Sequence, residues 1–197
     1  MATGAGPRRD ELLARGRHLE IITLAWNGVG ICVLALAALR ARSVALAGFG
    51  LDSLIEIGAS TVVLWELAGA AHDRQRRATR LIGVGFVALS IYLSVQSTLV
   101  IAIGFHPGHS ALGIVWTAIT AAAMFLLAAG KANTGAALDN AVLQAEGRVT
   151  LVDGILASAV LLGLLLNATL GWWWADPCAS YVLVAYGVRE ARTALGG

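Results

Sequence analysis

Charged residues are scarce in this sequence. Of its 197 residues, 13% are charged and 58% are hydrophobic, whereas soluble domains have about 25% charged and roughly 45–50% apolar residues. The mean hydropathy is correspondingly high, at +0.76. This composition excludes a disordered chain, a basic nucleic-acid-binding protein and almost any water-soluble fold. We therefore expect an all-α membrane protein embedded in a lipid bilayer.

Cysteine and recognisable catalytic motifs are also scarce. The sequence has two cysteines, Cys32 and Cys178, and each lies within an apolar run. Without a CxxC pair or a Cys/His cluster, neither a disulfide scaffold nor a zinc finger is indicated. HExxH, GxSxG and multi-aspartate lipid-transferase motifs are likewise missing. We therefore expect neither a resident cofactor nor an enzyme.

The N-terminal segment MATGAGPRRDELLARGRHLE is charged over too long a stretch for the basic region of a signal peptide. The first apolar run is therefore predicted to stay in the protein as a membrane helix. At roughly 20 residues per span, six spans take about 120 residues. The remaining length suffices for connections and short tails, so we expect no second domain.

The pattern of apolar runs predicts a six-helix transmembrane bundle over residues 19–188. The runs are separated by charged or glycine- and proline-containing segments. They place the spans at about residues 19–39, 44–67, 81–104, 111–130, 143–170 and 174–188. The predicted tails are residues 1–18 and 189–197. The C-terminal tail is expected to be too short to fold, which excludes a soluble C-terminal domain.

The distribution of basic residues predicts the orientation. Lys and Arg near the ends of spans are retained on the cytoplasmic side. With both termini inside, twelve of the 14 basic residues lie on that side and two lie outside. The twelve are Arg8, Arg9, Arg15, Arg17, Arg74, Arg76, Arg77, Arg80, Lys131, Arg148, Arg189 and Arg192, and the two are Arg40 and Arg42. We therefore predict cytoplasmic termini and a location in the plasma (inner) membrane.

Three acidic residues interrupt the apolar spans. An ionisable group in the hydrocarbon costs at least about 2.5–3.5 kcal/mol, so each is a functional candidate. Asp52 and Glu56, in GFGLDSLIEIGAS, are four residues apart, which places both on one helix face about 6 Å apart along the axis. Asp153, in EGRVTLVDGILAS, lies early in the fifth predicted span. We expect the three to meet between the membrane midplane and the cytoplasmic side.

The chemistry of such a group suits exchange of a metal for protons. Two nearby carboxylates repel each other, so an empty site favours a bound proton, and a divalent cation removes the repulsion. A structural reading stays open as well. Asp52 and Glu56 could be a hydrogen-bonded structural pair, and Asp153 could pair with an arginine or a backbone group.

Other polar residues have simpler interpretations. Acids at span ends are usually interfacial anchors, which we predict for Glu20 and Glu66. Glu146 is either a ligand in an inner vestibule or an ordinary flanking charge. The HPGH segment carries His106 and His109, which could bind metal weakly but are more simply solvated. Asp176 precedes Pro177 and is predicted to be a helix N-cap, with the proline at the first helical position.

Three segments resemble one family. SVALAGFGLDSLIEIGAS, QAEGRVTLVDGILASAVLLGLLLN and GWWWADPCASYVLVAYGVREA are similar to the second, fifth and sixth transmembrane helices of cation diffusion facilitators. The similarity runs from about residue 19 to 192. The DxxxE pattern resembles that of a small branch without a soluble tail, which includes a vertebrate synaptic-vesicle zinc transporter. The resemblance implies a six-helix protein, commonly a homodimer, that exports zinc or related divalent metals in exchange for protons.

The resemblance also implies a ligand set. Asp52 and Glu56 fall on the paired ligands of the second helix and Asp153 on the acid of the fifth. Val149 occupies a position where the family usually has His or Asp. Asn27, Cys32, Glu146 or water could complete the shell. Zinc favours nitrogen and sulfur donors, whereas an oxygen-only set suits harder ions, so we expect zinc with Mn, Fe, Co or Cd as alternatives.

The leading functional prediction is a secondary transporter that exchanges a divalent metal for protons by alternating access. Its expected partners are the metal, protons, the lipid bilayer and a second copy of the chain, with no nucleic acid. One alternative is a membrane module that binds metal or a partner subunit without transporting it. A membrane enzyme that uses the same carboxylates, for example on a lipid, is a further alternative.

Overall fold

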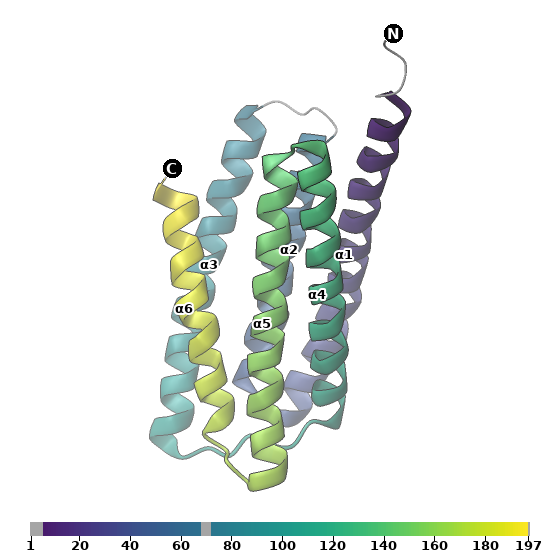
Figure 1. Ribbon diagram of the computed structural model, residues 1–197. Coiled ribbons are helices and arrows are strands. Elements are labelled where there is room, and N and C mark those ends of the chain that lie inside the picture. Colours follow the sequence, from purple (N-terminus) through teal and green to yellow (C-terminus); the bar gives the residue numbers. More distant parts are fainter. Residues whose placement is uncertain (1–5, 68–71, 197) are drawn as a thin grey trace.

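The computed structural model describes residues 6–67 and 72–196, and this part of the chain is helical without strands (Figure 1). It contains the helices α1 (Gly6–Ala41), α2 (Val44–Leu67), α3 (His72–Ile103), α4 (Ala111–Leu138), α5 (Ala141–Leu170) and α6 (Ala175–Gly196). The predicted all-α class is therefore confirmed. The side chains of Arg8, Glu66, Arg74, Arg76 and Arg77 lie outside the described part.

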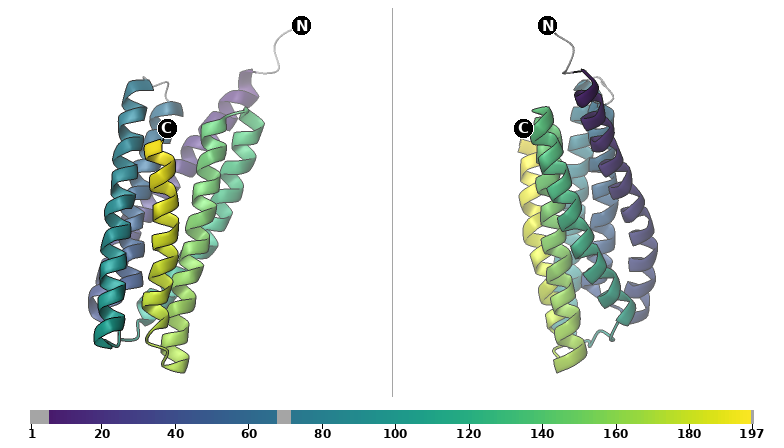
Figure 2. Two further views of the ribbon diagram at one scale, coloured as in Figure 1. Left: turned by 90° about the vertical axis from the view of Figure 1, so that its left-hand side faces the viewer. Right: turned by 45° about the vertical axis from the view of Figure 1, so that its right-hand side comes forward.

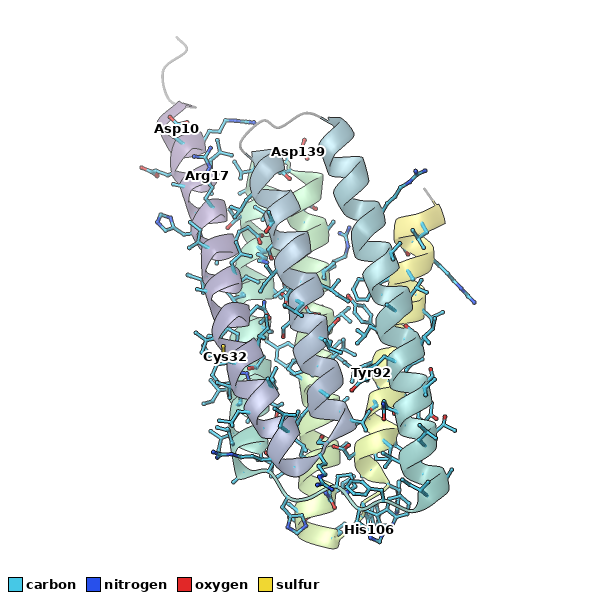
Figure 3. The ribbon with its side chains drawn as sticks, turned by 180° about the vertical axis from the view of Figure 1, so that it is seen from behind. Asp10, Arg17, Cys32, Tyr92, His106 and Asp139 are labelled. Atoms are coloured by element: carbon cyan, nitrogen blue, oxygen red, sulfur yellow. The ribbon has the colours of Figure 1, made fainter. Side chains whose placement is uncertain are left out.

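The helices run up and down along one bundle, and both chain termini lie at the same end (Figures 1 and 2). We call this the terminus end; Asp10 and Asp139 lie there (Figure 3). The opposite loop end contains the α1–α2 turn, the connection 104–110 with His106, and the connection 171–174 (Figures 1 and 3). The left view of Figure 2 shows α5 and α6 close together at the loop end and further apart toward the terminus end.

Four of the helices contain segments long and apolar enough to cross a membrane. These segments are Arg9–Ala41, Gly83–Ile103, Ala111–Leu138 and Leu143–Leu170, and they overlap the first, third, fourth and fifth predicted spans. Large apolar side chains point outward from the bundle, among them Leu39, Ile103 and Leu126, which are at least 70% exposed. Such a surface suits lipid rather than water. The chain is therefore described as an integral membrane protein.

The helices extend beyond the predicted spans. α1 begins at Gly6, α3 at His72 and α4 ends at Leu138, whereas the spans were placed at 19, 81 and 130. The segment 189–196, expected to be too short to fold, continues α6. The physical reason is that hydropathy marks where an apolar surface ends, while the backbone hydrogen bonds of a helix continue until a cap or an αL residue stops them. In α4 that residue is Asp139, at φ 52°.

Glycines allow close helix contacts at two places in the bundle. A Cβ atom on Gly147 of α5 would lie 2.9 Å from the backbone nitrogen of Ala132 in α4, and one on Gly163 would lie 2.9 Å from the carbonyl oxygen of Ala175 in α6. Backbone atoms cannot move aside as a flexible side chain can. These small residues therefore set the spacing between α5 and its two neighbours.

An acidic residue of α6 caps a different helix from the one predicted. Asp176 is the second residue of α6, and its carboxylate accepts hydrogen bonds from the Ser43 hydroxyl, the Val44 nitrogen at 3.0 Å and the Ala45 nitrogen at 3.4 Å. Ser43 Oγ in turn accepts from the nitrogen of Leu46 at 3.1 Å. The prediction that Asp176 caps its own helix is therefore wrong. It satisfies the free N–H groups of α2, where a negative charge also complements the helix dipole.

Replacing this carboxylate should destabilise the fold. We expect Asp176→Ala to lower the free energy of unfolding by about 1–3 kcal/mol, because it leaves buried donors of α2 unpaired. The exposed Asp10 offers a matched control, and Asp10→Ala should change it by no more than about 0.5 kcal/mol. Denaturant unfolding in detergent measures both. Equal effects of the two substitutions would contradict the capping role.

Candidate cation site

The three predicted acids all lie in the interior of the bundle. Asp52 and Glu56 of α2 are 4% and 6% exposed, and Asp153 of α5 is 3% exposed. Because they lie inside a bundle whose outer surface is apolar, these carboxyl groups contact neither bulk water nor lipid. Their burial has to be compensated by partners inside the protein.

Glu56 lies at the centre of this group. Its Oε2 accepts a hydrogen bond of 2.8 Å from Asn27 Nδ2 of α1, and the same amide also donates to the Thr23 carbonyl at 3.1 Å. The carboxyl groups of Glu56 and Asp153 are close enough to share a hydrogen bond when one of them holds the proton. Within the part of the chain that the structure describes, the buried atoms Glu56 Oε1 and Asp153 Oδ2 have no hydrogen-bond partner. These two oxygens can therefore receive a proton or a cation.

Asp52 lies one turn closer to the loop end. It is on the same face of α2 as Glu56, about 6 Å away along the helix axis, and its charge acts on both Glu56 and Asp153. In the described part of the chain, no three His, Cys, Asp or Glu side chains form a group that could hold a metal ion. The structure thus brings Glu56 and Asp153 together and leaves Asp52 outside their immediate contact.

The candidate fourth ligands have different positions. Asn27 is buried beside Glu56, whereas Cys32 is exposed on α1 (Figure 3). At the loop end, His106 and His109 are exposed, and the His106 ring lies edge-on to Trp173, with 4.8 Å between the centroids. Neither histidine is near the buried acids of the bundle interior.

A second polar cluster surrounds Lys131 of α4, which is completely buried. Its Nζ lies 3.1 Å from Glu20 Oε2 of α1, 3.3 Å from Glu146 Oε1 of α5 and 3.0 Å from Thr150 Oγ1 of α5. Ser60 of α2 donates a hydrogen bond to Glu146 Oε1 at 3.2 Å. The ammonium group therefore joins α4 to α1 and α5, and Glu146 joins α2 to the same cluster.

This cluster corrects the interpretation of several residues. Glu20 is 0% exposed, so its prediction as an interfacial anchor is wrong; the helix continues past it on both sides. Lys131 is likewise no flanking charge at the membrane surface, because it lies inside the bundle. Glu146 faces the interior, where it pairs with Lys131. One sequence signal for this was available, since Lys131 interrupts a helix whose apolar and small residues continue to Leu138.

Tyr186 of α6 is a buried polar residue that the sequence reasoning missed. It is 8% exposed, and its ring packs edge-on against Phe86, with 5.7 Å between the centroids. Its hydroxyl group has no hydrogen-bond partner among the described residues, and the charges of Asp52 and Asp153 act on it. From the sequence alone, a tyrosine in an apolar helix is interpreted as a core or interface residue. Its proximity to the acids becomes apparent only in the structure.

Comparison with known proteins gives one distant similarity. No family model matches the sequence. Transmembrane protein 163 from Xenopus laevis is 27% identical over 158 residues, which cover 76% of this chain and 56% of that protein. The chain thus spans little more than half the length of this relative. The similarity agrees with the apolar helices in indicating a membrane protein.

The Lys131 cluster yields a test of buried charge. Lys131→Met removes the cation and leaves Glu20 and Glu146 buried together, so we expect it to lower the free energy of unfolding by about 3–5 kcal/mol. Adding Glu20→Gln and Glu146→Gln removes the unpaired charges and should restore most of the loss. Denaturant unfolding in detergent checks both variants. A triple variant no more stable than Lys131→Met would contradict this account of the cluster.

Proposed function

We propose that this protein transports a divalent cation across a membrane and that Asp52, Glu56 and Asp153 bind the transported ion. The observation that carries the proposal is the pair of Glu56 and Asp153, which come from different helices and are buried. Each has one oxygen without a hydrogen-bond partner among the described residues. Burying like charges for structure alone is costly. A cargo cation would supply the charge that this pair lacks.

The donor atoms favour a particular class of cargo. The acids and the neighbouring Asn27 offer oxygen ligands, and Val149 supplies none. The resemblance to cation diffusion facilitators favours zinc, with Fe, Co and Cd as alternatives, and the oxygen-rich set suits a harder ion such as Mn. The distant similarity to a named transmembrane protein supports the membrane location.

Protons are the proposed counter-ions. Glu56 and Asp153 can share one proton across their contact. That proton neutralises the same negative charge that a bound cation would neutralise. Binding of a cation then releases the proton, and protonation releases the cation. Asp52, one turn away on α2, would join the two acids through a movement of α2 against α5. Alternating access of this kind makes the protein an antiporter without enzymatic activity.

The proposal includes a topology. Six membrane spans with both termini in the cytoplasm would place the Lys131 cluster on the cytoplasmic side of the three acids. The proposal also includes a location in the plasma membrane and assembly as a homodimer. The positions of the arginines in the sequence support the orientation.

A second function is favoured by one observation. Within the described residues no group of three His, Cys, Asp or Glu side chains is ready to hold a metal. The alternative is a membrane module that binds a metal or a partner subunit without transport, and its partner-binding form needs no assembled metal site. Comparing metal binding with net flux separates these two functions.

The transport proposal is tested in proteoliposomes loaded with a zinc-sensitive dye under a pH gradient. Asp52→Asn and Asp153→Asn should lower zinc uptake by about 10- to 100-fold, because each removes a negatively charged ligand while keeping the side-chain shape. Asp139→Asn is the matched control, because Asp139 is exposed at the α4–α5 turn and asparagine tolerates its αL conformation.

Three outcomes of this experiment are informative. Reduced uptake in both variants with normal uptake in the control supports transport through the acids. Unchanged uptake in the Asp52 and Asp153 variants would refute the assignment of these ligands. Zinc binding without net flux in the unmodified protein would favour the non-transporting module.

A further inference from the structure

The oxygen atoms around Lys131 have the arrangement of a cation site. Glu20 Oε2, Glu146 Oε1 and Thr150 Oγ1 lie 3.0–3.3 Å from the ammonium nitrogen, and all three residues are buried. We call these three residues the ammonium cage. The two carboxylate contacts are ion pairs, longer than the roughly 2.7–2.9 Å of the tightest charge-assisted hydrogen bonds. The occupant is therefore a cation that the chain itself supplies.

The ammonium cage has more binding capacity than its occupant uses. It contains two carboxylates around one positive charge. Among the described residues, Glu20 Oε1 has no hydrogen-bond partner, and Glu20 is 0% exposed. An ion with two positive charges would balance both carboxylates and could use this remaining oxygen.

The cage is separate from the three acids but lies on the same helices. Glu20 is seven residues from Asn27 on α1, and Glu146 is seven residues from Asp153 on α5, so the two sites are about 10 Å apart along the helix axes. The cage is on the side of the terminus end. The Lys131 charge also acts on Glu56, so the two sites are electrostatically coupled.

We propose that the ammonium cage is a second divalent-cation site, which the tethered Lys131 ammonium fills and thereby closes to free ions. Lys131 is then an internal competitor of the cargo and determines which of the two sites accepts it. That the competing ion is the transported one rests on the function proposed above. The existence of the cage as a cation site does not depend on transport.

The proposal is tested by counting bound Mn²⁺ on the purified full chain in lipid nanodiscs, by equilibrium dialysis and by the EPR signal of the free ion. Lys131→Ala empties the cage and should bind one Mn²⁺ per chain more than the unmodified protein. Lys131→Arg keeps a tethered cation, and Lys131→Ala combined with Glu146→Gln removes one carboxylate. Both should bind the same number as the unmodified protein.

Two results would overturn the proposal. One is a folded Lys131→Ala protein that binds no additional Mn²⁺. The other is an additional ion that persists when Glu146→Gln is combined with Lys131→Ala. If the unmodified protein binds no Mn²⁺ at all, the three-acid site of the proposed function fails, and a gain in Lys131→Ala still supports the cage.

A stability measurement covers the case in which Lys131→Ala folds poorly. Mn²⁺ should raise its melting temperature in detergent extracts, because the ion replaces the missing ammonium charge. The same addition should raise the melting temperature of the combined Lys131→Ala and Glu146→Gln variant no more than it raises that of the unmodified protein. Lack of Mn²⁺ rescue of Lys131→Ala, or equal rescue of both variants, means that the cage is only a structural ion pair.

Discussion

Burial of charge in an apolar bundle is the constraint on which this structure depends. Among the described residues, Glu20, Asp52, Glu56, Glu146, Asp153 and Asp176 are buried carboxylates, whereas Lys131 is the buried cation. One ammonium group cannot pair with all six carboxylates, so their burial is compensated in several different ways. Two face the ammonium group, and Asp176 accepts the N–H groups of a helix start. Glu56 has an amide contact and can share a proton with Asp153, and Asp52 lies one turn away on α2. The carboxylates differ in how completely they are paired. This difference separates acids with a structural role from acids that can still bind a proton or a cation.

Helix α1 connects the two polar groups in the interior. Its buried face carries Glu20, Thr23 and Asn27 in succession, so one helix contacts the ammonium cage at one level and Glu56 at the next. On its neighbouring face, Trp26 stacks on Trp116 with 5.2 Å between centroids and donates to Thr120 Oγ1 at 3.2 Å. This contact fixes the rotation of α1 against α4. A shift of α1 along its axis would therefore change the surroundings of both groups at once.

The sequence predicted the helices and the central acids better than their partners. Apolar runs are local signals, and the Asp52–Glu56 spacing is meaningful on any helix, so the helical class and the interior position of these acids could be anticipated. Glu20 and Lys131 were misinterpreted because they are 111 residues apart, and each alone looks like a charge at the end of a span. Asp176 was misassigned for a similar reason: its Asp-Pro sequence suggests a local cap, whereas its partners are more than 130 residues away. Contacts between distant segments carry no local pattern that could reveal them.

The hydrogen bonds of the loop end determine where the bundle can change shape. Asp176 holds the start of α6 to the start of α2, Asn167 Nδ2 donates to the Pro107 carbonyl at 3.0 Å, and the Gly108 nitrogen donates to the Ala41 carbonyl at 2.7 Å. These bonds link the ends of α1, α2, α5 and α6 and the connection between α3 and α4 at the loop end. When helices are held together at one end, they can rotate about that end, and the displacement of a residue grows with its distance from the held end. Any such rocking would therefore be small at Asp176 and largest at the end that carries both termini.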